Sequence, residues 1–477
     1  MASSPNLPKT LEVSHVAPFT ASPETTTHFT LPLTFFDMIW FKCPPSKRLF
    51  FYSLPEITKH AFLDSLLPKL KHSLSLTLQY FLPLAGKLTW PQDSPKPIVL
   101  YAPGDVVSVY VAESDADFDL LASNHAFQAS AVRPLVPLLH VSETGASLIA
   151  LQITVFPNRG FSIGVTTHHA VLDGKSAIMF MKSWAYLSKE DKPLLPELTP
   201  FYDRTIIKDP SGFDMKLLNI WSGSPGTTSS DCRNNPKLFE VFQLPSSGES
   251  SDLYRATFEL SRSDIDKLRQ RVSTSWDSST HISPKPKLHL SSFALTYAYV
   301  FNCILKATER DEITKKVLLA FPVDYRNRFT PPVPENYFGN FVGGKFNFDD
   351  MRETLLGRKE DSLTALVVKI SALIEEMGKQ NDPKKEAEKI LLKLCSTSTS
   401  ENSRHIGVAG SPRFGEYSID FGWGRPKKVA ILSIESGSIS MAESKDGNGG
   451  IEVGLVLKKH QMDLFTFVFF TDLTNIS

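Results

Sequence analysis

A short polar segment follows a run of residues typical of a β-strand, and it holds the side chains best suited to acid–base chemistry. The segment runs from Thr166 to Gly174 and contains two adjacent histidines, His168 and His169, with Asp173 four residues after the second. A histidine without a neighbouring nucleophile is suited to general-base catalysis, because imidazole accepts a proton near neutral pH. Since side chains alternate along a strand, we expect only one histidine to line a given cavity, and His169 shares a face with Val165.

Three other kinds of site are possible on these residues or near them. The sequence has no GxSxG motif, so a serine acyl-enzyme lacks support. Joint metal ligation by His168, His169 and Asp173 is awkward, because adjacent strand residues point to opposite faces. The run from Gly339 to Phe346 fits GxxxxGK, but Phe346 stands where a phosphate-binding loop needs Ser or Thr. The general-base, metal and purely structural interpretations of the histidine pair stay open here.

A second candidate motif, DFGWG, spans Asp420 to Gly424. Its glycines, Gly422 and Gly424, flank an aromatic residue and predict a tight, packed loop. Asp420 is a candidate catalytic carboxylate, but we favour its role as an anchor of this loop.

Composition excludes several classes of protein. The chain has 477 residues, 51 Lys and Arg against 51 Asp and Glu, and a formal net charge of zero, so no overall basic field attracts nucleic acid or anionic lipid. Its four cysteines form no CxxC pair, which indicates neither a zinc site nor a disulfide framework. The first fifteen residues lack the pattern of a secretory signal, and the apolar stretch 288–305 carries too many polar residues for a membrane span. We therefore expect a cytosolic protein with neither nucleic acid nor membrane as a partner.

The elements that must position the two motifs follow from local patterns. The runs 149–156 and 160–167 predict a β-hairpin, and Lys175 to Leu187 predicts a helix that starts near Asp173 and Gly174. Leucines at spacings of three and four over 56–80 predict a pair of core-facing helices broken at Pro68. The fold class is α/β (α+β), and we divide the chain into an N-terminal domain, a crossover rich in Pro, Ser and Gly, and a C-terminal domain, at 1–188, 189–235 and 236–477.

The two motifs resemble the signatures of the plant BAHD acyltransferases. HHAVLDG at 168–174 and DFGWG at 420–424 stand in the expected order, about 250 residues apart. Further similar segments begin at Leu31 (LPLTFFDMIWF), Val155 (VFPNRGF), Tyr202 (YDRTIIKDP) and Asn336 (NYFGN), and they resemble the branch that acts on anthocyanin and flavonoid glucosides, especially the malonyltransferases of phenolic glucosides. That branch often reads YFGNC, whereas this chain has Phe341 in place of the cysteine.

The resemblance implies a fold and a reaction. It implies two chloramphenicol-acetyltransferase-like domains joined by a long crossover loop, with a channel at their interface and His169 midway along it. The donor would be an acyl-CoA, first of all malonyl-CoA, used as a co-substrate without a bound cofactor or metal. The acceptor would be a sugar hydroxyl of a phenolic, flavonoid or anthocyanin glucoside, and the enzyme would act on these small molecules as a monomer.

The resemblance also implies roles for individual residues. Asp173 would pair with Arg326 and so turn away from His169, a structural role that we favour over direct orientation of the base. Lys287, Ser291 and Ser292 match the family's segment at the CoA entrance. Lys175 is the cation nearest in sequence to the HxxxD loop, so it is a candidate for holding a malonyl carboxylate, although we favour a solvent-facing position, which is the commoner one for lysine.

Other functions remain open at this stage. A hydroxycinnamoyl-CoA anthocyanin acyltransferase of the same branch would differ in its donor, and an N-acyltransferase would differ in its acceptor. A catalytically idle binding protein of this fold and a metal-dependent hydrolase that uses the histidine pair belong to other classes.

Overall fold

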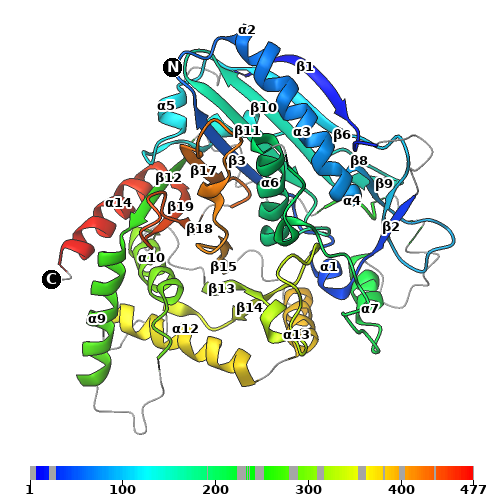
Figure 1. Ribbon diagram of the computed structural model, residues 1–477. Coiled ribbons are helices and arrows are strands. Elements are labelled where there is room, and N and C mark those ends of the chain that lie inside the picture. Colours follow the sequence, from blue (N-terminus) through cyan, green and yellow to red (C-terminus); the bar gives the residue numbers. More distant parts are fainter. Residues whose placement is uncertain are drawn as a thin grey trace.

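The computed structural model describes a mixed α/β molecule, and the described residues form four sheets, of six, five, three and five strands (Figure 1). The residues described are 7–20, 28–190, 192–222, 233, 235, 237–241, 252–278, 288–308, 316–352, 361–379, 382–396, 403–434 and 437–475. The strands are β1 (Lys9–Val16), β2 (Phe29–Pro32), β3 (Ser46–Ser53), β4 (Lys87–Thr89), β5 (Ile98–Tyr101), β6 (Val107–Glu113), β7 (Phe127–Gln128), β8 (Val141–Ser142), β9 (Gly145–Ser147), β10 (Ile149–Phe156), β11 (Gly160–Thr167), β12 (Leu253–Leu260), β13 (Lys316–Asp324), β14 (Val342–Asn347), β15 (Ser403–Ile406), β16 (Val408–Gly410), β17 (Lys428–Ile431), β18 (Ile439–Glu443) and β19 (Ile451–Lys458).

Helices cover the faces of these sheets. The α-helices are α1 (Phe35–Ile39), α2 (Lys59–Ala61), α3 (Leu67–Tyr80), α4 (Leu82–Ala85), α5 (Phe118–Leu121), α6 (Gly174–Lys189), α7 (Phe213–Trp221), α9 (Arg262–Ser278), α10 (Ser292–Thr308), α12 (Ser362–Lys379), α13 (Pro383–Ser396) and α14 (Lys459–Thr474). Short 3₁₀ turns are η3 (Ala129–Leu135), η4 (Pro196–Leu198), η5 (Arg326–Arg328) and η6 (Glu416–Ser418). No helix among the residues placed here is long and apolar enough to cross a membrane.

The predicted hairpin forms the centre of the first sheet. β10 and β11 pair along their whole length, from Ile149 opposite Thr167 to Phe156 opposite Gly160, and every residue of both strands is buried. The sheet order is β1-β6-β10-β11-β3-β17. Both strands are buried on both faces, which explains the continuous apolar character of these two runs. The helices α3 and α6 lie over one side of the sheet (Figure 1).

The helix after the hairpin also matches its prediction. Asp173 adopts an extended backbone conformation at the N-cap of α6, where its Oδ1 accepts a hydrogen bond of 2.9 Å from the backbone N–H of Ser176. The buried face of α6 carries Ile178, Met181 and Trp184 against the sheet. The end of β11 and the start of α6 thus hold the polar segment between two packed elements.

The predicted helix break at Pro68 is wrong. The chain stays helical from Lys59 to Tyr80, with a π-helical turn, η2 (Phe62–Leu66), between α2 and α3. Pro68 is the second residue of α3 and directly follows the π turn, which accommodates the missing backbone N–H inside the helical run. The wider π turn therefore precedes the proline and lets the helical run continue past it.

The two halves of the chain share strands. β17, from the C-terminal half, pairs with β3 and completes the first sheet, with Ile431 opposite Arg48. In the other direction, β7 pairs with β12 at the edge of the second sheet, whose order is β16-β18-β19-β12-β7. The boundaries at 188 and 235 remain a proposal, and part of the proposed crossover (191, 223–232 and 234) lies outside the described residues.

Candidate active site

The histidine pair lies just beyond the end of β11, so the assignment of both residues to a strand is wrong. β11 ends at Thr167, and residues 168–171 form a turn that leads to α6. The turn nevertheless separates the two side chains, because His168 is buried and His169 is only half-buried. His168 Nδ1 accepts a hydrogen bond of 3.2 Å from the backbone N–H of Ala170, which gives it a structural role in the turn.

Both imidazoles are held in the neutral form. Burial lowers the pKa of His168 to about 4, and the nearby charges of His169 and Lys42 add to this effect. Burial also lowers the pKa of His169, although its own backbone carbonyl and Asp173 oppose the shift. Among the described residues, His169 Nδ1 is buried without a hydrogen-bond partner, and the residue as a whole is half-buried, which leaves Nε2 as the candidate atom for contact with a substrate. Nε2 of a neutral His169 is therefore the atom able to accept a proton from a substrate.

The pH dependence of the reaction should reflect this lowered pKa. Because the active base is neutral imidazole, kcat/KM should fall only as the pH drops below the pKa of His169 in the free enzyme. We expect the acidic limb to have its midpoint below the ordinary histidine value of ~6.5, with a constant rate through pH 7. A pH series of kcat/KM measures this midpoint. A midpoint above 6.5 would mean that the charge of Asp173 outweighs burial.

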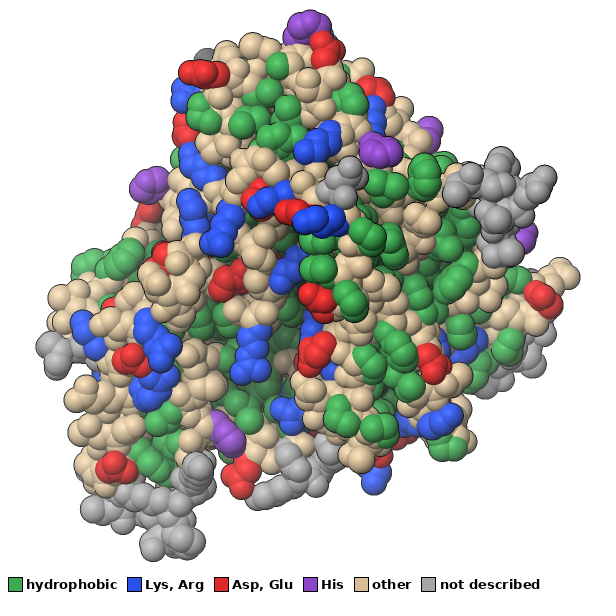
Figure 2. Space-filling view, viewed as in Figure 1, with side chains coloured by type: hydrophobic (Ala, Val, Ile, Leu, Met, Phe, Trp, Pro, Cys, Tyr) green, Lys and Arg blue, Asp and Glu red, His purple; other side chains and the backbone are tan. Residues whose placement is uncertain are grey.

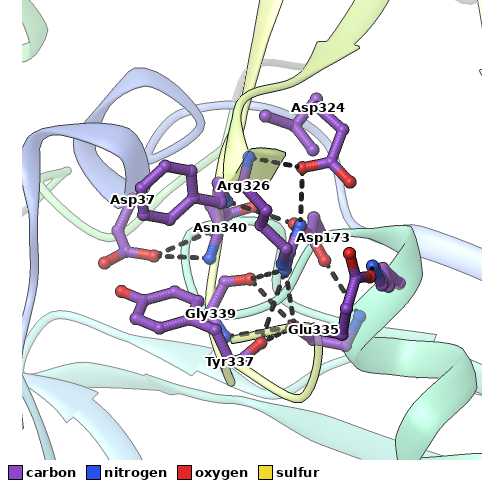
Figure 3. A network of polar contacts seen from close by, with 12 residues as sticks. Asp37, Asp173, Asp324, Arg326, Glu335, Tyr337, Gly339 and Asn340 are labelled. Atoms are coloured by element: carbon purple, nitrogen blue, oxygen red, sulfur yellow. Dashed lines mark hydrogen bonds and ion pairs between the residues drawn. The ribbon is translucent and has the colours of Figure 1, made fainter. Parts of the chain in front are cut away.

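The carboxylate of Asp173 is fully engaged by groups other than His169. Its Oδ2 lies 2.8 Å from Nη2 of Arg326 and accepts a hydrogen bond of 3.1 Å from the backbone N–H of Phe341, while Oδ1 caps α6. Arg326 is completely buried and also contacts Asp324 at 3.2 Å. Figure 3 shows the guanidinium between these two carboxylates, close to the carbonyls of Tyr337 and Gly339. The pair that the resemblance implied is present, and Asp173 points away from the imidazole.

The NYFGN segment connects this ion pair to the backbone of His169. The side-chain amide of Asn340 donates to the carbonyl of His169 at 2.8 Å and to Oδ1 of Asp37 at 3.1 Å. Asp37, which faces Asn340 in Figure 3, is completely buried near the start of α1. Its Oδ2 accepts hydrogen bonds from the backbone and hydroxyl of Thr34. Arg204 lies 3.6 Å from the same carboxylate. The turn that carries His169 is therefore tied to α1 through two buried side chains.

Phe341, which replaces the cysteine common in the related branch, is accommodated by an aromatic cluster. Its ring centroid lies 4.4 Å from that of Phe36 and 4.9 Å from that of Phe329. The side chain is completely buried, and its backbone N–H still donates to Asp173. The departure from the family pattern therefore alters the core and leaves the ion pair intact.

The DFGWG loop lies at the opposite end of α6 from the histidine. Asp420 accepts hydrogen bonds from Lys189 Nζ at 2.7 Å and from the backbone N–H groups of Gly422 and Gly424 at 2.8 and 2.9 Å. Both glycines have positive φ, near +100°, which fits the predicted tight loop. Burial would raise the pKa of Asp420, but these donors outweigh burial and lower it.

The position of this loop limits what Asp420 can do. The loop packs on Phe161, at the start of β11, through Trp423, with ring centroids 6.1 Å apart. His169 follows the other end of the strand, and the rise of ~3.3 Å per residue places the two motifs roughly 20 Å apart. This separation agrees with an anchor role for Asp420 and places it out of reach of a proton on a substrate at His169.

The predicted CoA contacts have different environments. Lys287 lies outside the described residues. Ser291 precedes α10, and its Oγ accepts from the backbone N–H of Ala294 at 3.2 Å, while Ser292 is the first residue of that helix. Lys175 forms an ion pair with Glu335, so it already has a carboxylate partner. The two serines are at least partly exposed at a helix N-terminus, a position compatible with an anionic ligand.

The sequence analysis missed a cation beside His169. Arg48, on β3, is buried, and its Nε donates to Glu416 at 3.1 Å. A Cβ on Gly174 would lie 3.0 Å from Nη2 of Arg48, so the absence of a side chain there lets the guanidinium approach the HxxxD loop. The charge of Arg48 also disfavours protonation of His169. Arg48 is 121 positions before His169 in the sequence, so only the pairing of β3 with β11 brings them together.

The fold and the site together define a class of protein. Two lobes enclose a hollow on the face shown in Figure 2, and a neutral histidine in a turn between sheet and helix offers one accessible nitrogen. Within the described ranges, no group of three or more His, Cys, Asp or Glu side chains is placed to hold a metal ion. This arrangement is suited to an enzyme that uses a general base.

Comparison with known proteins identifies the family. The model of the Transferase family matches residues 10–469, nearly the whole chain, and the chain therefore belongs to this family of BAHD acyltransferases. It is 41% identical over 475 residues to phenolic glucoside malonyltransferase 1 of Arabidopsis thaliana, covering 98% of each chain. It is also 42% identical over 455 residues to malonyl-CoA:anthocyanidin 5-O-glucoside-6''-O-malonyltransferase of the same plant, covering 94% of this chain and 95% of the relative.

Solved structures confirm the predicted fold class. The crystal structure of vinorine synthase aligns with a TM-score of 0.67 at 17% identity and covers 96% of both chains. The structure of F. graminearum TRI101 complexed with coenzyme A and T-2 mycotoxin aligns with a TM-score of 0.58 at 13% identity, covering 91% of this chain and 96% of the other. At these identities the likeness concerns the fold alone.

Proposed function

We propose that this protein transfers a malonyl group from malonyl-CoA to a sugar hydroxyl of a phenolic glucoside, such as a flavonoid or anthocyanin glucoside. The observation that carries the proposal is the match over almost the entire chain to two malonyltransferases of glucosides. The geometry of His169 supports it, because a neutral, accessible imidazole nitrogen is what the acceptor hydroxyl requires. Asp173, Arg326 and Gly174 support the turn that carries this histidine.

The reaction follows from general-base chemistry at His169. Nε2 accepts the proton of the sugar hydroxyl while the oxygen attacks the carbonyl carbon of the thioester and forms a C–O bond. Collapse of the tetrahedral intermediate breaks the C–S bond, and the thiolate of CoA takes the proton from the imidazolium. The products are the malonyl ester and free CoA, and the base returns to its neutral form. The proposal needs no bound cofactor, and acyl-CoA is consumed as a co-substrate.

The donor preference is open to a direct test. Malonyl-CoA carries a carboxylate that the site must neutralise, and the two cations near the HxxxD loop, Arg48 and Lys175, each already pair with a carboxylate, Glu416 and Glu335. The preference for malonyl-CoA therefore rests on the match to the two malonyltransferases. We expect malonyl-CoA to outcompete acetyl-CoA and coumaroyl-CoA when all three are offered with one flavonoid glucoside. Mass spectrometry of the products gives the ratio. Preferential coumaroyl transfer would instead support the hydroxycinnamoyl-CoA anthocyanin acyltransferase alternative.

The remaining alternatives are separated in the same assay. Turnover that survives a chelator contradicts a metal-dependent hydrolase, and an amine acceptor such as agmatine tests N-acylation. A catalytically idle binding protein would bind acyl-CoA in calorimetry yet form no product with any acceptor. We also propose that the enzyme acts as a monomer in the cytosol on small molecules, with neither nucleic acid nor membrane as a partner. Its formal net charge of zero supports the absence of a nucleic-acid partner.

A further inference from the structure

The indole of Trp40 lies flat against the imidazole of His169. The two ring centroids are 4.4 Å apart, and the planes differ by only 10°. Trp40 is the C-cap residue of α1, 129 positions before the histidine, so the tertiary fold creates this contact. A stacked aromatic ring opposes rotation of its neighbour away from the parallel orientation.

Trp40 is itself held by two hydrogen bonds. Its indole Nε1 donates to the carbonyl of Val342 at 2.8 Å, and its backbone N–H donates to the carbonyl of Asp37 at 3.1 Å. The side chain of the same Asp37 accepts from Asn340, which holds the carbonyl of His169. One turn of α1 therefore restrains both the ring and the backbone of His169.

The imidazole needs such a restraint, because no carboxylate orients it. In Ser-His-Asp triads an aspartate hydrogen-bonded to Nδ1 fixes the orientation of the imidazole. Here Asp173 is committed to Arg326, Ser176 and Phe341, and Nδ1 of His169 has no hydrogen-bond partner among the described residues. The ring torsion of a histidine is intrinsically broad, so an unrestrained imidazole would sample many orientations.

We propose that Trp40 is the positioning residue for the catalytic base, and that its stacked indole holds Nε2 of His169 in the direction of the acceptor hydroxyl. The inference rests on the proposed acyl transfer and deepens it. When His169 takes the proton of the hydroxyl, the resulting imidazolium lies over the face of the indole. A cation in this position is attracted by the ring, so Trp40 also stabilises the charge that develops during the reaction.

A series of substitutions tests the role of the ring. Trp40→Leu keeps an apolar side chain without a stacking surface, and we expect kcat to fall by about 10 to 100-fold, as is usual when a catalytic group loses its alignment. Trp40→Phe keeps an aromatic ring, so this variant should retain most of the wild-type kcat. The KM for acyl-CoA should change little in both variants. In a His169→Ala background, Trp40→Leu should cause no further loss, because the residue acts only through the imidazole.

Trp221→Leu is the matched control. The indole Nε1 of Trp221 donates to the carbonyl of Met38 at 2.7 Å, so this substitution perturbs the same helix α1 without removing the ring on His169. We expect Trp221→Leu to retain far more activity than Trp40→Leu. Equal losses in the two variants, or an additive loss in the His169→Ala background, would overturn the proposal and indicate a packing role.

A second measurement does not depend on turnover. In protein labelled at histidine, the ring current of Trp40 should shift the His169 Cε1–H resonance upfield, and the His169→Ala spectrum identifies that resonance. We expect the resonance to move downfield in Trp40→Leu and to stay in place in Trp221→Leu. An unmoved resonance in Trp40→Leu would refute the stack in solution. By contrast, a wild-type enzyme that is inactive with every donor and acceptor would refute the proposed function and leave this result standing.

Discussion

His169→Ala should lower kcat by roughly 10² to 10⁴-fold, the usual cost of removing a positioned general base. Among the described residues near this turn, none of the other titratable side chains is free to accept the proton. His168 is buried and bonded to Ala170, and Asp173 is committed to Arg326. Asp420 lies at the far end of α6. The variant should stay folded, since the hydrogen bond from Asn340 that holds this turn goes to the backbone carbonyl of His169, which the substitution keeps. Steady-state kinetics with malonyl-CoA and a flavonoid glucoside measures the loss, and thermal unfolding checks the fold.

His168→Ala provides the internal comparison. His168 is buried and accepts a hydrogen bond from Ala170, so its loss should lower stability more than it lowers the rate of the chemical step. An inactive His168 variant together with an active His169 variant would show that the roles of the two histidines are reversed.

Breaking the Asp173–Arg326 pair should be the most damaging change to stability. Arg326 is completely buried and Asp173 is 2% exposed, so Arg326→Ala leaves a buried carboxylate without its counter-charge. Asp173→Ala leaves the buried guanidinium with Asp324 as its remaining carboxylate partner. We expect Asp173→Ala and Arg326→Ala each to destabilise the fold by about 3 to 5 kcal/mol. The double variant should be far less destabilised than the sum, because the second change removes the charge that the first left unpaired.

Denaturant unfolding of the wild type, both single variants and the double variant measures the coupling. The exposed pair Lys459–Asp463 on α14 is a suitable control, and its cycle should show little or no coupling. Additive effects at Asp173 and Arg326 would contradict a buried ion pair and would favour a direct role of Asp173 in orienting the base.

Local patterns predicted the elements around the site well. The hairpin 149–167 and the helix after Asp173 depend on strand periodicity, a turn and an N-cap, all of which are short-range signals. The exact end of β11 was missed, because the turn that follows Thr167 is closed by a backbone hydrogen bond from Val171 to His168, which strand periodicity does not predict. The π-helical turn before Pro68 was missed for a similar reason, since no local rule predicts it.

Local sequence patterns do not predict contacts between segments that are distant in the sequence. The pairing of Asp173 with Arg326 was predicted through the family resemblance, because 153 positions separate them and periodicity does not connect them. The stack of Trp40 on His169, the bond from Asn340 to Asp37 and the approach of Arg48 to Gly174 each depend on how α1, β3 and the NYFGN segment meet. These contacts position the base, and only the three-dimensional structure shows them.

The pairing of β17 with β3 has a consequence for how the molecule is made. β3 ends at Ser53, whereas its outer neighbour begins at Lys428, so the ribosome must complete almost the entire polypeptide before this sheet can close. Until then β3 presents an unpaired edge of apolar residues, which is prone to pair with other chains. Nascent or truncated chains that stop before β17 should therefore depend on chaperones. If the two halves were expressed as separate polypeptides, the first sheet would be complete only after the two fragments associate.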